Sequence, residues 1–242
     1  MTEHFAFTVL GWQEIHSMKE IKATFNGSQV SVRDGMTILE AAREHGIYIP
    51  TLCYRAELSP IGVCRICVVE VTGSRTLVAA CHTPVTEGMI INTHSPTVLA
   101  TRRIILRLLL ASHCGTCYMC AKANTCELRH LAAELDVGLP DFEPKRRYYP
   151  IEDVSPYLVR DLSKCILCRR CVRACTEIAR HSFFAIGYRG FYSKIVVDLD
   201  KPINKDACRD CDVCVSLCPT GALSKPCQLP YEKKGSPLII KS

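Results

Sequence analysis

The chain has 242 residues, enough for one to three small domains, and 17 of these residues are cysteines. So many cysteines could form a disulfide scaffold, but such scaffolds are usually short secreted chains. Residues 1–10 lack the basic and apolar regions of a signal peptide. The most apolar run, Ile104–Ala111, is too short to cross a membrane and contains Arg107. We therefore expect a soluble, cytoplasmic protein whose clustered cysteines bind metal.

The formal net charge of +6 counts every cysteine as neutral. Iron–sulfur clusters on thiolates are anionic, and with the four clusters argued below the net charge falls to about −1. The basic residues then compensate the clusters within the chain. The charge is therefore not evidence for nucleic-acid binding.

A hairpin is predicted after an N-terminal extension, residues 1–17, which shows no clear period. Two strand-like runs, Ile21–Phe25 and Gln29–Val32, flank Asn26-Gly27. This dipeptide is the strongest short hairpin signal, because both turn positions need a positive φ.

A helix is predicted directly after the hairpin. Thr37 at the N-cap and Glu40 three residues later form a capping box. Gly46 suits the position after the last helical turn. A hairpin followed by a helix is the start of a β-grasp domain, which we expect to span residues 18–96.

The same domain holds a first set of candidate ligands, spaced C-x10-C-x2-C-x13-C. The set is Cys53, Cys64, Cys67 and Cys81. Pro60 and Gly62 let backbone N–H groups approach the sulfurs of a cluster. A structural zinc site is the alternative, but such sites usually have two C-x2-C pairs, and only Cys64 and Cys67 form one. We favour a [2Fe–2S] cluster.

The run Thr97–Ser112 is predicted to be a helix that leads into a second set. Arg102, Arg103 and Arg107 fall on one side, and we expect this side to face solvent. The predicted apolar side consists of Ile104, Ile105, Leu108 and Leu109.

The second set reads H-x3-C-x2-C-x5-C. It consists of His113, Cys117, Cys120 and Cys126. Three thiolates and one imidazole at this spacing suit a soft metal centre, here a [4Fe–4S] cluster in a small helical domain, residues 97–136. Cys114 lies beside His113 and could compete as the fourth ligand.

Two segments show turn-forming residues rather than a helical or strand period. Residues 137–156 contain four prolines and the triplet Lys145-Arg146-Arg147, which predicts a linker with surface charge. The tail, residues 227–242, is rich in proline and lysine and begins with Cys227.

Two runs near the C-terminus share the spacing C-x2-C-x2-C-x3-C. The first is Cys165, Cys168, Cys171 and Cys175, and the second is Cys208, Cys211, Cys214 and Cys218. In two-cluster bacterial ferredoxins the fourth cysteine of each run ligates the other cluster. One [4Fe–4S] cluster is then expected on Cys165, Cys168, Cys171 and Cys218, and the other on Cys208, Cys211, Cys214 and Cys175.

Between the two runs a second hairpin is predicted. Its strands are Phe183–Tyr188 and Lys194–Val197, joined through Arg189-Gly190. With the two cysteine runs it forms a ferredoxin domain, residues 157–226. The expected fold class is therefore α+β, with three cluster-binding domains and a total of one [2Fe–2S] and three [4Fe–4S] clusters.

Four motifs together resemble a known family. SPIGVCRICVVEV with Cys53 and Cys81, HCGTCYMCAKANTCEL, CILCRRCVRAC and CRDCDVCVSLCPTGAL resemble the N-terminal cluster-binding region of the large iron–sulfur subunit of respiratory complex I. The region also occurs in [FeFe]-hydrogenases and some NAD-dependent formate dehydrogenases. It further resembles the free-standing diaphorase subunit of bidirectional, NAD-reducing [NiFe] hydrogenases, the form that we expect because the chain ends soon after the second run. The family pattern implies His113 rather than Cys114 as ligand.

The sequence shows no substrate chemistry of its own. It has no G-x-G-x-x-G on a strand–helix unit, no P-loop, and no further paired cysteines for a nickel–iron or diiron site. The resemblance implies a non-catalytic electron-transfer subunit of an NAD(P)-linked oxidoreductase, first of all a bidirectional [NiFe] hydrogenase. Its partners would be a flavin- and NAD-binding subunit and a catalytic subunit. An electron-bifurcating hydrogenase or a formate dehydrogenase is the alternative complex.

Two hypotheses from other classes compete with this one. A zinc-bound interaction or nucleic-acid module would explain clustered cysteines and positive charge, but ferredoxin spacing and the lack of a basic–aromatic patch disfavour it. A free-standing mobile ferredoxin needs only one or two centres, fewer than the four predicted here.

Overall fold

The computed structural model describes residues 20–226, except residues 114, 139, 141, 143–145, 153–154, 156, 202–207 and 209–210. Two compact units make up the chain: Met1–Pro50 with Cys67–Thr101, and Thr51–Ile66 with Arg102–Ser242. The predicted extension, residues 1–17, the tail, residues 227–242, and Cys114 lie outside the described residues.

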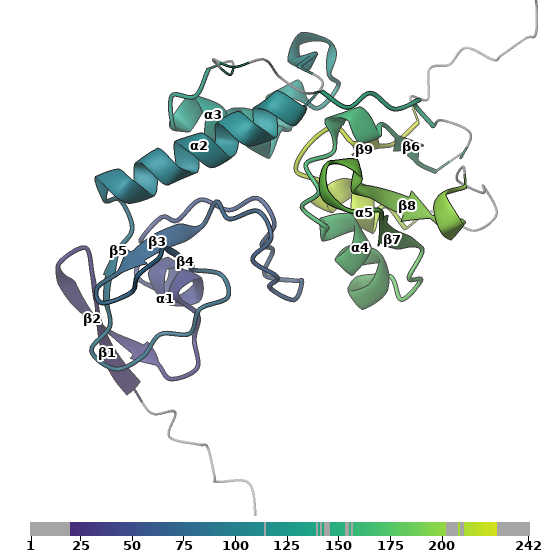
Figure 1. Cartoon of the computed structure of the whole chain (residues 1–242). Coiled ribbons are helices and arrows are strands. Elements are labelled where there is room, and N and C mark those ends of the chain that lie inside the picture. The colour runs from purple at the N-terminus through teal and green to yellow at the C-terminus, as the bar shows by residue number, and fades with distance from the viewer. Residues whose placement is uncertain are drawn as a thin grey trace, which may run out of the picture. The chain divides into compact units, whose positions relative to one another are not determined.

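The first unit is built on a five-stranded mixed sheet in the order β2-β1-β5-β3-β4 (Figure 1). β1 pairs antiparallel with β2 and parallel with β5, while β3 pairs antiparallel with β5 and β4. The strands are β1 Glu20–Phe25, β2 Ser28–Arg33, β3 Val68–Val71, β4 Val78–Ala79 and β5 Ile90–Asn92. Alternate residues of β1 point into the core, namely Ile21, Ala23 and Phe25.

The turn and cap signals of this unit are confirmed. Asn26 and Gly27, with φ of 50° and 87°, connect β1 to β2. The helix α1, Ile38–Glu44, opens with the predicted capping box of Thr37 and Glu40. It ends at Glu44, and Gly46, which follows the C-cap, has a φ of 68° and an N–H that donates to the carbonyl of Arg43 at 3.1 Å. The helix buries Ile38, Leu39, Ala41 and Ala42.

The helix α2, Pro96–Ser112, carries the chain from the first unit into the second. The helix itself is confirmed, and Arg103 and Arg107 are exposed as predicted, but the predictions for Arg102 and for the apolar side are wrong. Arg102 is 1% exposed, whereas Ile104 and Leu108 are 56% and 57% exposed. The buried stripe runs through Val98, Arg102 and Leu106, each four residues after the last. The four residues of the predicted apolar side therefore do not mark the centre of the buried side.

The second unit combines short helices with two small two-stranded sheets. Its helices are α3 Glu127–Glu134, α4 Arg170–Arg173 and α5 Val213–Leu217, and α4 continues into a π-helical turn, Ala174–Ile178. Its strands are β6 Val159–Arg160, β7 Phe184–Gly187, β8 Lys194–Val197 and β9 Leu223–Ser224. β6 pairs antiparallel with β9, and β7 with β8. Short 3₁₀ turns lie at Cys117–Met119, Ala123–Thr125, Leu162–Lys164, Gly190–Tyr192 and Asp198–Asp200.

The hairpin predicted between the two cysteine runs is confirmed as β7 and β8. Phe184 pairs with Val197, and Gly187 pairs with Lys194. Phe184, Ile195 and Val197 are buried in one core with several cysteines of the two runs. The hairpin therefore covers the cysteine-rich part of the unit.

None of the helices among the described residues has the length and apolar character needed to cross a membrane.

Candidate metal centres

One cavity of the second unit is lined by four thiols. They are Cys165, Cys168, Cys171 and Cys218. Three come from the first cysteine run, and the fourth follows α5, at the end of the second run. This is the grouping that the ferredoxin spacing predicts, including the exchanged fourth cysteine.

A second cavity is lined by the remaining four thiols of the two runs. They are Cys175, Cys208, Cys211 and Cys214. Cys175 lies in the π-helical turn that extends α4, so the helix carries its side chain away from the cavity that Cys171 lines. Phe183 and Phe184 form part of the wall. The backbone N–H of Phe183 donates to Sγ of Cys175 at 3.2 Å.

Most thiols of the two cavities are shielded from water, whereas Cys211 is exposed. Burial raises the pKa of Cys165 to about 11 and that of Cys168 to about 12. Burial likewise raises the pKa of Cys214 to about 12, with the neighbouring thiol of Cys208 as the next cause. Thiols in such surroundings become thiolates only where a cation compensates their charge. The donor sets therefore fit iron–sulfur clusters, whose irons supply that charge.

No group of three or more Cys, His, Asp or Glu side chains in the described part of the chain meets at a point suited to a single metal ion. The thiols line cavities instead. None of the fifteen cysteines that the structure describes is in a disulfide.

Left-handed backbone positions recur inside the C-x2-C pairs. Leu167, Arg169 and Asp212 have φ of 56°, 60° and 53°, and Arg65 has φ of 59°. A positive φ is uncommon for residues other than glycine. At Leu167 it accompanies a backbone N–H that donates to Sγ of Cys165 at 3.4 Å. Such N–H···S contacts stabilise anionic sulfur. The sequence patterns did not single out these residues as functional, although the C-x2-C spacing marks them.

The second predicted set lies along the segment between the end of α2 and the start of α3. His113 is 6% exposed and directly follows the helix, and Cys126 is 7% exposed at the N-cap of α3. Burial raises the pKa of the Cys126 thiol, and the charges of Cys117 and Cys120 add to the effect. Burial also lowers the pKa of His113, helped by the positive charge of Lys164. A lowered pKa keeps the imidazole neutral, the form that ligates metals.

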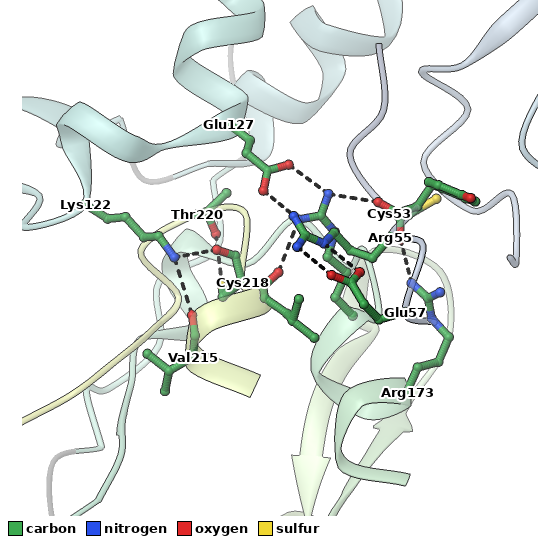
Figure 2. A network of polar contacts seen from close by, with 12 residues as sticks. Cys53, Arg55, Glu57, Lys122, Glu127, Arg173, Val215, Cys218 and Thr220 are labelled. Atoms are coloured by element: carbon green, nitrogen blue, oxygen red, sulfur yellow. Dashed lines mark hydrogen bonds and ion pairs between the residues drawn. The ribbon is translucent and has the colours of Figure 1, made fainter. Parts of the chain in front are cut away.

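The segment that carries Cys120 and Cys126 is joined to the second cysteine run. Figure 2 shows Nζ of Lys122 donating to the carbonyl oxygens of Cys218, at 2.5 Å, and Val215, at 3.4 Å. The backbone N–H of Glu127 donates to the carbonyl of Pro219 at 2.9 Å. A Cβ at Gly221 would lie 2.7 Å from Sγ of Cys120. The segment of Cys120 and Cys126 thus packs closely on the turn that carries Cys218.

The cysteines of the first predicted set are divided between the two units. In the first unit, Cys67 and Cys81 are buried beside β3 and β4, and the N–H of Ala80 donates to the carbonyl of Cys67 at 3.1 Å. In the second unit, Cys53 is buried and Cys64 is partly buried on the loop 51–66. Gly62 of this loop has φ of 60°, which glycine adopts without strain. The four-cysteine set remains a prediction from spacing.

Three family models match successive parts of the chain. Residues 18–96 match a 2Fe-2S iron–sulfur cluster binding domain. Residues 102–139 match the NADH-ubiquinone oxidoreductase-G iron–sulfur binding region. Residues 155–224 match the ferredoxin-like domain of NADH-quinone oxidoreductase subunit 3. The chain is an iron–sulfur protein with mixed helix and strand structure that combines [2Fe–2S]- and [4Fe–4S]-binding domains.

A solved structure of similar fold shows to which family of iron–sulfur proteins the chain belongs. A chain in the crystal structure of NAD+-reducing [NiFe]-hydrogenase in the H2-reduced state is 32% identical, with a TM-score of 0.74. The match covers 84% of the present chain and 86% of that chain. The protein belongs to the family of iron–sulfur proteins that this hydrogenase chain represents.

Curated relatives are longer proteins. The NADP-reducing hydrogenase subunit HndD of Solidesulfovibrio fructosivorans is 38% identical over 85% of the present chain and 36% of its own length. An NADH-quinone oxidoreductase subunit of Rhizobium meliloti is 35% identical over 90% of the chain and 25% of its own. The alpha subunit of the NADPH-Fe(3+) oxidoreductase of Geobacter sulfurreducens is 34% identical over 85% of the present chain and 24% of its own length. The chain thus spans only about a quarter to a third of these relatives.

Proposed function

We propose that the chain is a non-catalytic electron-transfer subunit of an NAD(P)-linked oxidoreductase of the hydrogenase type. It relays electrons in the cytoplasm between a flavin- and NAD-binding subunit and a catalytic subunit, as part of a hetero-oligomer. The main observation that supports this proposal is that two cavities are lined by the eight ferredoxin-type cysteines, four in each cavity. The similarity to the NAD+-reducing hydrogenase chain and to HndD supports the type of complex.

We further propose one [2Fe–2S] and three [4Fe–4S] clusters. The [2Fe–2S] ligands are Cys53, Cys64, Cys67 and Cys81, and the first [4Fe–4S] ligands are His113, Cys117, Cys120 and Cys126. The other two clusters take the cavity sets: Cys165, Cys168, Cys171 and Cys218 for one, and Cys175, Cys208, Cys211 and Cys214 for the other. Bound clusters would supply one-electron chemistry. The chain gathers the ligands around two cavities and directs backbone N–H groups at Cys165 and Cys175.

Metal analysis of the full chain, purified anaerobically, tests this proposal. We expect about fourteen irons, broad absorption near 400 nm that dithionite bleaches, and low-temperature EPR signals of both cluster types. The chain alone should pass electrons to dyes but oxidise neither NADH nor H2. A colourless protein with a few zinc ions would replace the proposal with a structural zinc module. Oxidation of NADH or H2 by the chain alone would contradict the non-catalytic role.

The fourth ligand of the second set can be tested by substitution. His113→Ala should lose iron from one [4Fe–4S] cluster, because three thiolates remain, whereas Cys114→Ala should keep all of it. His113→Cys should retain the cluster but make it harder to reduce, since a fourth thiolate adds negative charge. Iron content and an EPR-monitored redox titration measure both effects. Loss of the cluster in Cys114→Ala but not in His113→Ala would make Cys114 the ligand.

A further inference from the structure

Two arginines of α4 are buried among the candidate ligands. Arg170 is 1% exposed and Arg173 is 7% exposed. A guanidinium keeps its charge inside a protein and is almost never buried unless hydrogen-bonded and paired. Arg170 directly precedes Cys171, and Arg173 lies two residues before Cys175. Their partners therefore show what is held next to the cluster-binding helix.

Arg170 joins three segments of the second unit. Its Nη1 and Nη2 donate to the two carboxylate oxygens of Glu127, at 2.6 and 2.8 Å. Nη1 also donates to the carbonyl of Leu217 at 3.2 Å, and Nη2 to the carbonyl of Tyr54 at 3.3 Å. Each of these partners directly follows or precedes a candidate ligand, namely Cys126, Cys218 and Cys53. Figure 2 labels Glu127 and marks the contacts of its carboxylate with dashed lines. This bidentate pair fixes the plane of the Arg170 guanidinium.

Arg173 holds the loop 51–66 at two further points. Its Nη2 donates to the carbonyl of Cys53 at 2.6 Å (Figure 2), and its Nη1 donates to the carbonyl of Ser59. One helical turn later, the carboxylate of Glu177 accepts the N–H of Ser59 at 2.8 Å and its hydroxyl at 2.5 Å. Leu58 of the loop is buried against Ala174 and Leu217.

Besides the pair with Glu127, these contacts of the two arginines end on backbone carbonyls. Three of them end on carbonyls of Cys53, Tyr54 and Ser59, so they fix the course of the loop itself. Only a side chain with several donors in a rigid fork can reach separate carbonyls and a carboxylate at once. Lysine offers a single ammonium on a flexible stem and cannot reproduce the geometry.

We propose that Arg170 and Arg173 are positioning residues that clamp the loop carrying Cys53 onto the helix carrying Cys171. They thereby hold Cys53, a proposed [2Fe–2S] ligand, at a fixed position relative to the [4Fe–4S] cluster of Cys165, Cys168, Cys171 and Cys218. This inference rests on the proposed electron-transfer function. Electron transfer between two centres slows steeply as their separation grows, so a loop that leaves the helix slows the relay.

Substitutions in the full, cluster-loaded chain test the clamp. The variants are Arg173→Gln, Arg173→Lys and the milder Glu177→Gln, and the matched control is Arg189→Gln, which removes one exposed guanidinium. Hydrogen exchange of residues 51–66 should rise about tenfold or more in Arg173→Gln, because hydrogen bonds to a buried charge are lost. Arg173→Lys and Glu177→Gln should give smaller rises, and Arg189→Gln none.

Freeze-quench EPR after rapid partial reduction supplies the functional readout, since the two cluster types are observed at different temperatures. We expect electron exchange between the [2Fe–2S] and [4Fe–4S] centres to slow severalfold in Arg173→Gln, while the iron content stays unchanged. Across all the variants, the exchange rate should fall as the hydrogen exchange of the loop rises. An unchanged exchange rate with an opened loop would overturn the clamp proposal. So would a loop that stays closed in Arg173→Gln. A wild-type chain without clusters would instead refute the proposed function.

Should Arg173→Gln lose its iron, Arg173→Lys and Glu177→Gln decide the question by the same two measurements. The contacts of Glu177 lie on the partly exposed edge of the loop, and its substitution leaves both buried guanidinium groups in place. A shift of the loop in these variants without any slowing of electron exchange would again overturn the proposal.

Discussion

Cys218→Ala is expected to damage the [4Fe–4S] cluster of the first cysteine run, although residue 218 ends the second run. Cys218 lines the cavity of Cys165, Cys168 and Cys171, so its loss leaves that set with three thiols. Cys175→Ala should damage the other cluster for the same reason. Each variant should lose between one iron and the whole of a single cluster, about four irons, together with one [4Fe–4S] EPR signal.

Double substitutions show which cluster each cysteine serves. Cys218→Ala combined with Cys171→Ala removes two ligands of one set, so only one cluster should be affected. Cys218→Ala combined with Cys211→Ala removes one ligand from each set, so both clusters should be affected. Two sites that act on one cluster give non-additive losses, and independent sites add.

The opposite pattern would contradict the exchange of ligands between the runs. If Cys218 served the cluster of its own run, the pair with Cys211 would affect one cluster and the pair with Cys171 would affect two. Cys227→Ala is the matched control, because Cys227 belongs to none of the four predicted sets and its loss should leave the iron content unchanged.

Local signals predicted the local structure well. The turn at Asn26-Gly27 depends only on the positive φ that these two residues accept, and the structure has it there. The capping box of Thr37 and Glu40 is likewise a contact within one helical turn. The repeated cysteine spacing is a third local pattern, and the cavities gather the cysteines in the groups that it indicates.

Burial could not be predicted from the same local patterns. Because charge usually faces water, the pattern predicts a solvated face for Arg102, yet Arg102 lies on the buried stripe of α2. The contact from Arg173 to Cys53 joins residues 120 positions apart, and the contact from Arg170 to Tyr54 spans 116. No periodicity within either segment encodes such a pairing. The arginines of the CRRCVRAC run could be noticed in the sequence, but their partners could not.

Gly221→Ala is expected to disrupt the cluster of His113, Cys117, Cys120 and Cys126. A Cβ at this position would lie 2.7 Å from Sγ of Cys120, closer than Cβ atoms approach other heavy atoms, and 3.4 Å from Cδ of Lys164. Overpacking of this kind costs about 1–3 kcal/mol when the neighbours can shift. In a chain without clusters the Cys120 thiol can rotate away. A thiolate that ligates iron cannot rotate away, so the clash destabilises the cluster.

The chain offers a matched control in Gly138→Ala, since a Cβ at Gly138 would meet nothing within 4 Å. We expect Gly221→Ala to lose up to about four irons and one [4Fe–4S] signal while the other clusters persist, and Gly138→Ala to keep the full content. Thermal unfolding of the metal-free chains should differ little between the two variants. Full iron with an unchanged EPR spectrum in Gly221→Ala would show that Cys120 is not a ligand held in this position.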